Sequence, residues 1–213
     1  MAKKEKGIFI TFEGGEGVGK TTQIARLAQI FEKQGHRVIV TREPGGSNTA
    51  NRIRSLLLDA KMKGLVPLAE LFLYEASRAQ HVQEVILPAL KSGHIVICDR
   101  FADSSSVYQG VGRKLAPNLV TKLNKIATNG LQPTLTFVLD LNPQIGLARV
   151  GARGILDRIE KETLSFHLAV RNGFKKLAKQ EPKRCILINA SQSRDEIHEN
   201  IITVLRKRKF LSE

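Results

Sequence analysis

Residues 14–22 read Gly-Gly-Glu-Gly-Val-Gly-Lys-Thr-Thr and match the pattern G-x-x-x-x-G-K-[ST]. The short apolar run at 7–13 comes directly before this loop and predicts a buried strand. After the loop, apolar residues recur at the spacing of one helix face, at Ile24, Leu27, Ala28 and Phe31. The loop therefore stands between a predicted strand and a predicted helix, which is the context that phosphate-binding loops of this pattern require.

The residue types in this loop suit an anion. Glycines allow backbone N–H groups to turn inward, because a side chain would block their approach. The following helix adds the positive end of its dipole. Lys20 is placed to reach the β- and γ-phosphates of a nucleotide, and the Thr21 hydroxyl to bind Mg²⁺. The alternative, a chance glycine-rich turn, does not account for the flanking strand and helix.

Apolar runs predict a sheet of five strands separated by helical stretches, at 7–13, 37–42, 94–99, 134–140 and 184–189. These runs are continuously apolar, which is typical of a parallel sheet covered by helices on both faces. We expect one doubly wound α/β domain over residues 1–213, with ligands at the carboxyl ends of the strands. The polar residues predicted to converge there are Glu13, Arg42, Glu43, Asp99, Arg100, Asp140 and Asn189.

The composition is basic, with a formal net charge of +14. That charge fits nucleic-acid binding or anionic small substrates, and the low aromatic content and the lack of a nucleic-acid reading motif favour the second. No apolar run reaches the length of about 18 residues that predicts a membrane span. The N-terminus is charged and has no apolar signal segment, which predicts a cytoplasmic protein. Cys98 and Cys185 lie in apolar runs without paired spacing, and we expect buried free thiols.

Two segments carry side chains that suit a second ligand. Arg42 and Glu43 flank a Pro-Gly turn at a predicted strand end, where the alternative is a plain turn. Tyr74 and Arg78 stand four residues apart in a helical region predicted over 67–92 and bent near Pro88, so they share one face. An aromatic ring beside a guanidinium can hold a planar base. The alternative is a tyrosine at the edge of the core and an unrelated surface arginine.

Asp99 follows an apolar strand, where an acidic residue can organise Mg²⁺, and the adjacent Arg100 can bind a second phosphate. Residues 103–110 carry hydroxyls, an amide and an aromatic ring, and predict a polar loop that leads into a helix. Residues 149–160 hold three arginines with two glycines between them, and predict a mobile lid that closes over phosphates. A solvated helix face with Arg–Glu pairs is the alternative for this last segment.

Together these segments resemble the thymidylate kinase family of the bacterial kind, over nearly the whole chain. The segments that carry the resemblance are FEGGEGVGKTTQ at 12–23, TREPGG at 41–46, IRSLLLD at 53–59, YEASRAQH at 74–81, CDRFADSSSVYQG at 98–110 and ARGILDRIE at 152–160. The first segment alone indicates only a nucleotide. The second and fifth distinguish this family from adenylate, guanylate and cytidylate kinases.

The resemblance implies a P-loop kinase that uses ATP and Mg²⁺ to phosphorylate dTMP, and that forms a homodimer. It implies that ATP phosphates lie against Gly14, Gly15, Glu16, Gly17, Val18, Gly19, Lys20, Thr21 and Thr22. The implied catalytic residues are Lys20, Asp99, Arg153 and Arg158, since the loop has no base of its own besides Lys20 and the lid supplies the arginine. Thr21 and Asp99 are the implied metal-site residues.

For the acceptor, the resemblance implies Arg100 at the phosphate of dTMP, Glu16 near the sugar, and Tyr108 against the deoxyribose, where it excludes a 2′-hydroxyl. Arg78 is implied to hydrogen-bond thymine, and Tyr74 to stack on it where the family usually has phenylalanine. The remaining residues implied at this site are Glu43, Pro44, Ser105 and Gln109. We expect the Glu43–Pro44 bond to be cis, and the net charge is higher than is usual for the family.

Two alternatives stay open at this point. The acceptor could be dUMP or another nucleoside monophosphate. The chain could instead be a P-loop switch or ATPase that controls a partner, with nucleic acid as one candidate because of the charge. Such a switch would release phosphate without transferring it, and it would not need the second nucleotide pocket that Tyr74, Arg78 and Arg100 indicate.

Overall fold

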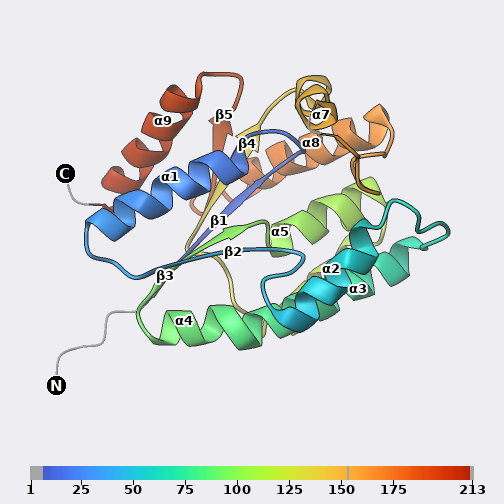
Figure 1. Cartoon of the computed structure of the whole chain (residues 1–213), viewed down its shortest axis with the longest axis horizontal. Coiled ribbons are helices and arrows are strands. Elements are labelled where there is room, and N and C mark those ends of the chain that lie inside the picture. The colour runs from blue at the N-terminus through green and yellow to red at the C-terminus, as the bar shows by residue number, and fades with distance from the viewer. Residues whose placement is uncertain (1–6, 153, 212–213) are drawn as a thin grey trace.

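A computed structural model of the chain describes residues 7–152 and 154–211. In that part of the chain, five parallel strands form one sheet in the order β2-β3-β1-β4-β5 (Figure 1). Their bounds are β1 Ile8–Gly14, β2 Val38–Arg42, β3 Ile95–Asp99, β4 Leu135–Asp140 and β5 Cys185–Asn189. The predicted strands and the parallel sheet are confirmed.

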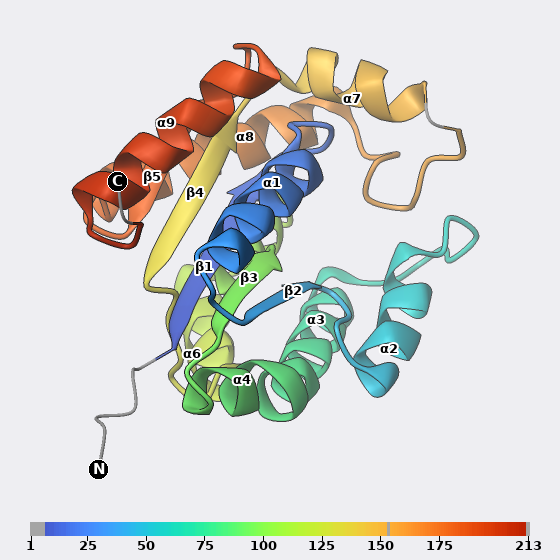
Figure 2. The same cartoon turned by 60° about the vertical axis from the view of Figure 1, so that its left-hand side comes forward.

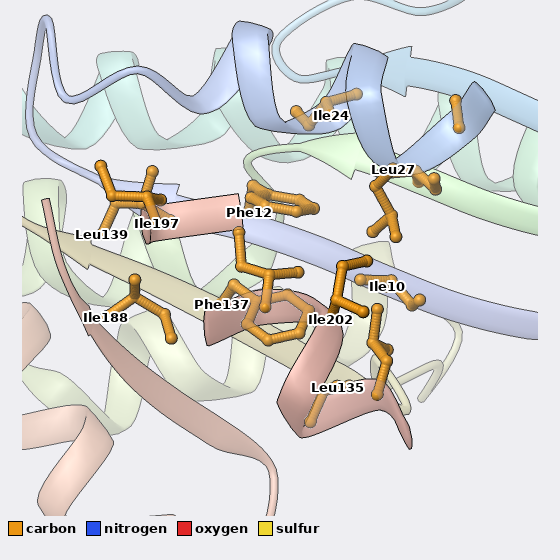
Figure 3. Packing of buried hydrophobic residues seen from close by; sticks show 14 of the residues in the cluster. Ile10, Phe12, Ile24, Leu27, Leu135, Phe137, Leu139, Ile188, Ile197 and Ile202 are labelled. Atoms are coloured by element: carbon orange, nitrogen blue, oxygen red, sulfur yellow. The ribbon is translucent and has the colours of Figure 1, made fainter. Parts of the chain in front are cut away.

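One face of the sheet is covered by α1 (Lys20–Lys33) and α9 (Arg194–Lys207). Alternate strand residues such as Ile10, Phe12 and Phe137 point into this layer, where Ile24 and Ile202 meet them (Figure 3). α1 follows β1 after a short loop, and its buried apolar face fixes it on the sheet. This packing holds the loop at residues 15–19 in place at the carboxyl end of β1.

The opposite face is covered by α8 (Leu164–Gln180), the π-helical turns η1 (Val82–Ile86) and η2 (Ser106–Gly112), and α4 (Leu87–Lys91). Phe9 and Val96 point to this side and pack with Val82 and Phe101. Helices therefore cover both faces of the sheet, as predicted.

α2 (Asn48–Leu58) and α3 (Pro67–His81) lie side by side beyond the β2 edge of the sheet (Figure 2). The helical region predicted over 67–92 is present. Its regular α-helical geometry is interrupted by the π turn η1, which ends before Pro88, where the bend was predicted. The predicted polar loop at 103–110 is wrong, because α5 (Ala102–Ser105) and η2 make this segment helical from its start. The remaining helices are α6 (Pro117–Ala127) and α7 (Pro143–Gly151).

Cys98 and Cys185 are both buried and free, as expected. Within the described ranges, every helix is too short or too polar to span a membrane.

Candidate active site

The glycine-rich loop joins β1 to α1 with the backbone conformation that its glycines permit. Gly17 and Gly19 have φ angles of 65° and 96°, a region that other residues rarely adopt. Lys20, only 8% exposed, donates from Nζ to the Gly15 carbonyl at 3.0 Å. Burial lowers the pKa of Lys20 and the Arg100 charge adds to this, while Asp99 and Glu16 oppose it. The ammonium group is thus held inside the loop.

α7 supports this loop through a backbone contact. A Cβ on Gly146 would lie 2.2 Å from the Glu16 carbonyl oxygen, and a Cβ on Gly17 would lie 2.2 Å from the Gly146 carbonyl oxygen. The two backbones can approach this closely only because both residues are glycine. The glycine-rich loop and α7 are therefore in direct contact.

Asp99 stands at the end of β3, in register with Phe12 of β1 and Arg42 of β2. Its Oδ1 lies 4.0 Å from Lys20 Nζ. This oxygen is buried and accepts no hydrogen bond from any residue that the structure describes. A buried carboxylate oxygen without a donor could accept hydrogen bonds from the water shell of a cation such as Mg²⁺. Thr21, in the first turn of α1, is exposed toward the same cavity.

The loop opens into a cavity of about 690 Å³, a size suited to small-molecule ligands. From the loop to the α2–α3 side, its lining residues include Glu16, Lys20, Thr21, Glu43, Pro44, Arg54, Tyr74, Arg78, Asp99, Arg100, Ser105, Tyr108, Gln109 and Arg149. The sequence-predicted residues of the loop and of the second ligand site thus share one cavity, apart from Gly14 and Gly15, which do not line it.

Arg100 connects the loop to the second half of the cavity. Its backbone has a φ of 71°, uncommon for a residue with a side chain. Nη1 donates to the Gly14 carbonyl at 2.7 Å, and Nη2 to Glu16 Oε1 at 2.7 Å. The Tyr108 hydroxyl donates to the same Glu16 oxygen at 2.7 Å. Burial would raise the pKa of Glu16, but the Arg100 and Lys20 charges outweigh it and lower this pKa to about 2.

Glu13, the buried residue before the loop, holds the segment that follows Arg100. Its Oε1 accepts the Phe101 N–H at 2.8 Å, and its Oε2 accepts the Ser104 hydroxyl at 2.6 Å. Burial, together with the nearby Asp103 carboxylate, raises the pKa of Glu13 to about 7. The sequence places Glu13 at a strand end but carries no sign of this function, which depends on β1 and β3 being neighbours.

Arg78 is buried and bound on most sides. Nε donates to Glu43 Oε2 at 2.8 Å, and Nη1 donates to Glu75 Oε1 at 2.6 Å. Nη1 also lies within hydrogen-bond distance of Ser105 and Asn124, and Nη2 donates to the Phe101 carbonyl at 3.2 Å. One Nη2 hydrogen is left over by these bonds with described residues. Arg78 is therefore a rigid donor at the cavity wall.

The turn after β2 is held by the same network. The Glu43–Pro44 bond is cis, which confirms the expectation. Glu43 Oε1 pairs with His81 Nδ1 at 3.0 Å, and Arg54 Nη1 donates to the Pro44 carbonyl at 2.8 Å. Arg54 lines the cavity but was not among the predicted site residues, although it lies within the IRSLLLD segment.

Tyr74 and Gln109 complete this end of the cavity. Tyr74 lies one helical turn before Arg78, and its hydroxyl forms no hydrogen bond with the residues described. Burial raises the pKa of this hydroxyl, so it remains neutral. Gln109 Nε2 donates to Glu70 Oε1 at 2.8 Å, and the amide borders the cavity.

Residues 149–160, the predicted lid, are described except for one position. Arg149 Nη1 donates to the Gly17 carbonyl at 3.3 Å and borders the cavity. Arg153 lies outside the described residues. Arg158 donates from Nη1 to Glu70 Oε2 at 2.6 Å and from Nε to the Leu57 carbonyl at 2.8 Å, so its guanidinium lies against α2 and α3. In this conformation Arg158 is not among the cavity-lining residues.

Two of the polar residues predicted at the sheet edge are structural. Asp140 binds Arg171 with both carboxylate oxygens, at 2.6 and 3.0 Å. Asn189 accepts hydrogen bonds from Ser191 and shapes the turn after β5. Neither residue lines the cavity.

Comparisons with known proteins agree on one family. The family model described as thymidylate kinase matches residues 12–201. A thymidylate kinase of Geotalea uraniireducens is 52% identical over 196 residues, covering 89% of this chain and 92% of that protein. One of Deinococcus radiodurans is 48% identical, covering 95% and 98%. The crystal structure of thymidylate kinase from Ehrlichia chaffeensis superimposes with a TM-score of 0.77 at 36% identity, covering 94% of this chain and 99% of that one.

Proposed function

This chain belongs to the thymidylate kinase family, and we propose that the cavity beside the glycine-rich loop holds ATP at that loop and dTMP at the α3–η2 side, so that one phosphoryl group passes between them. The family transfers the γ-phosphoryl group of ATP to dTMP, giving dTDP and ADP, and this chain is a kinase of that kind. The observation that carries the residue assignment is that Lys20, Asp99, Arg100, Tyr74 and Arg78 line the same cavity.

The donor half is the loop from Gly14 to Thr22. Lys20 adds positive charge where negative charge develops between the β- and γ-phosphates, and the backbone N–H groups hold the phosphates in line. The Thr21 hydroxyl would bind Mg²⁺ directly. The unpaired Asp99 oxygen would hold it through a water molecule. When bound, Mg²⁺ supplies charge that neutralises the phosphate oxygens during transfer.

The acceptor half lies between Arg100 and the α2–α3 pair. We assign the phosphate of dTMP to Arg100, the sugar to Glu16 and Tyr108, and thymine to Tyr74, Arg78, Ser105 and Gln109, with Glu43 and Pro44 shaping the wall. Arg100 is well suited to a phosphate because Glu16 and the Gly14 carbonyl fix its guanidinium before the substrate arrives. Phosphoryl transfer depends on this kind of positioning, since no covalent nucleophile is needed.

The lid over residues 149–160 is the proposed source of the additional arginine. Arg153 remains the sequence-based prediction for the residue that reaches the transferred group. For Arg158, the bonds to Glu70 and Leu57 favour anchoring the lid in the conformation described, and a catalytic contact would require these bonds to break. Exclusion of water by the closed lid would protect ATP from hydrolysis.

We also propose a homodimer that acts in the cytoplasm. Exposed Leu68 and Phe72 stand four residues apart on α3 and give that helix an apolar outer face. Light scattering should give twice the 23.6 kDa of one chain, and a monomer mass would remove this part of the proposal. Free Cys98 and Cys185 suit a reducing compartment.

The division of the cavity can be tested with two variants. Lys20→Ala should lower kcat by about 10²–10³, because it removes one transition-state contact, while the KM for dTMP stays nearly constant. Tyr74→Ala should raise the KM for dTMP by about tenfold, because stacking is lost, while the KM for ATP stays nearly constant. Tyr74→Phe is the matched control and should remain close to wild type. If Tyr74→Ala raised the KM for ATP instead, the two halves would be reversed.

A further inference from the structure

We propose that Glu70, a residue behind the cavity wall, sets the base selectivity of the acceptor site by fixing the orientation of the Gln109 amide. The inference rests on the proposed assignment of Tyr74, Arg78 and Gln109 to the base of the acceptor. It adds a positioning residue to that site, and it predicts which bases the site accepts and which it rejects.

Glu70 is the meeting point of three segments of the chain. It lies on α3 with 1% of its surface exposed, one helical turn before Tyr74. Its Oε1 accepts from Gln109 Nε2 at 2.8 Å and from Arg113 Nε at 3.1 Å. Its Oε2 accepts from Arg113 Nη2 at 3.1 Å and from Arg158 Nη1 at 2.6 Å. Both oxygens are therefore occupied, and the carboxylate has no room to rotate.

Glu70 remains ionised in this setting. Burial by itself would raise the pKa of Glu70, but the hydrogen bonds from Arg113 and Gln109 outweigh it and lower this pKa. An ionised carboxylate can only accept hydrogen bonds. The part of the Gln109 amide that faces Glu70 must therefore be its NH₂ group, and the reverse orientation would set two acceptors against each other.

The orientation of Gln109 determines what the cavity offers to a base. Because Nε2 faces Glu70, Oε1 is the other end of the amide, and it accepts no hydrogen bond from the described part of the chain. Gln109 and Arg78 both line the cavity. Arg78 contributes the Nη2 hydrogen that its bonds to the described residues leave over. At this wall Gln109 thus offers an acceptor and Arg78 a donor, each in a fixed direction, whereas the hydroxyls of Ser105 and Tyr74 can act as either.

This pair complements a base that presents a ring N–H next to a carbonyl oxygen. Thymine and uracil do so with N3–H and O4. Cytosine presents the reverse, a lone pair at N3 next to an amino group, and it would leave buried polar groups unpaired. Unpaired polar groups are the basis of strong rejection of near-isosteric ligands. Glu70 makes no contribution to the choice between thymine and uracil, since both carry the same N3–H.

The test compares kcat/KM for dTMP, dUMP and dCMP at saturating ATP in wild type and in Glu70→Gln. An amide at position 70 can donate as well as accept, so the Gln109 amide is free to turn over. We expect the ratio of dTMP to dCMP to fall by about tenfold or more, through the KM values of the acceptors. The ratio of dTMP to dUMP should not change. Arg113→Lys is the matched control, because it alters another partner of Glu70 while it keeps a positive charge beside the carboxylate and leaves Gln109 in place; it should keep the wild-type ratios.

A second pair of variants separates failure of the inference about Glu70 from failure of the base-site assignment. Glu70→Asp retains the charge that faces Arg113 and Arg158, and so protects folding; it should give an intermediate ratio of dTMP to dCMP. Gln109→Met removes the amide at similar length and should lower the same ratio. If Gln109→Met lowers it while both Glu70 variants keep the wild-type value, the inference about Glu70 is wrong and the base site stands. If Gln109→Met leaves the KM for dTMP unchanged, the assignment of the base site is itself wrong, and the inference fails with it.

Discussion

Glu13 illustrates how a single buried carboxylate can support a strained neighbour. Arg100 adopts a φ of 71°, and the next residue is held in place by the bond from the Phe101 N–H to Glu13. Glu13→Ala leaves that N–H buried without a partner, which costs about 1–3 kcal/mol of unfolding free energy. It should also raise the KM for dTMP, because Arg100 is less well positioned. Chemical denaturation together with acceptor kinetics would measure both effects, and normal values for both would refute this function of Glu13.

The titration of Glu13 gives a pH dependence with a defined sign. Burial and Asp103 raise its pKa from 4.5 to about 7 in the folded protein, so the folded state binds this proton more tightly than the unfolded state does. Its contribution to stability is complete below pH 4.5 and is lost as pH rises through about 7, by up to about 3 kcal/mol. Wild type should therefore lose more unfolding free energy than Glu13→Gln between pH 5 and pH 8. Equal losses in the two proteins would contradict this pKa.

At the scale of the elements, α7 and the glycine-rich loop form one unit through Gly146 and Gly17. In Gly146→Ala the new Cβ meets the Glu16 carbonyl, so the loop must move. We expect kcat/KM for ATP to fall by about tenfold or more, since small displacements of positioning groups are costly in phosphoryl transfer. Gln144→Ala on the same helix is the matched control, because this side chain is exposed and does not line the cavity. Equal activity of the two variants would show that the contact does not position the loop.

At the scale of the whole molecule, the sheet was predictable because its signals are local. Each strand is a continuous apolar run, and β1 is followed directly by a motif with fixed spacing. The residues of the acceptor site could be named only through the resemblance to a family. The spacing of Tyr74 and Arg78 indicates only that they share one helix face. That spacing fits a base-binding pair, and it fits equally a tyrosine at the edge of the core beside an unrelated surface arginine.

The supporting contacts could not be predicted for a physical reason. Glu70, Gln109 and Arg158 lie far apart in the chain, and no periodicity or spacing records that three elements bring them together. For the same reason Asp140 and Asp99 looked alike as acidic strand ends, although Arg171 neutralises the first and the second keeps an unpaired oxygen. Segment 103–110 was predicted as a loop because its composition is polar, and packing against α8 makes it helical instead.

In the proposed reaction, one cavity brings ATP and dTMP together for direct transfer. The most direct measurement follows the label from ATP marked in its γ-phosphoryl group, in the presence of Mg²⁺, with and without dTMP. The predicted result is label in dTDP when dTMP is present, with little release of labelled inorganic phosphate in its absence. Release of labelled phosphate at the same rate with and without dTMP, and no labelled dTDP, would contradict direct transfer and indicate an ATPase.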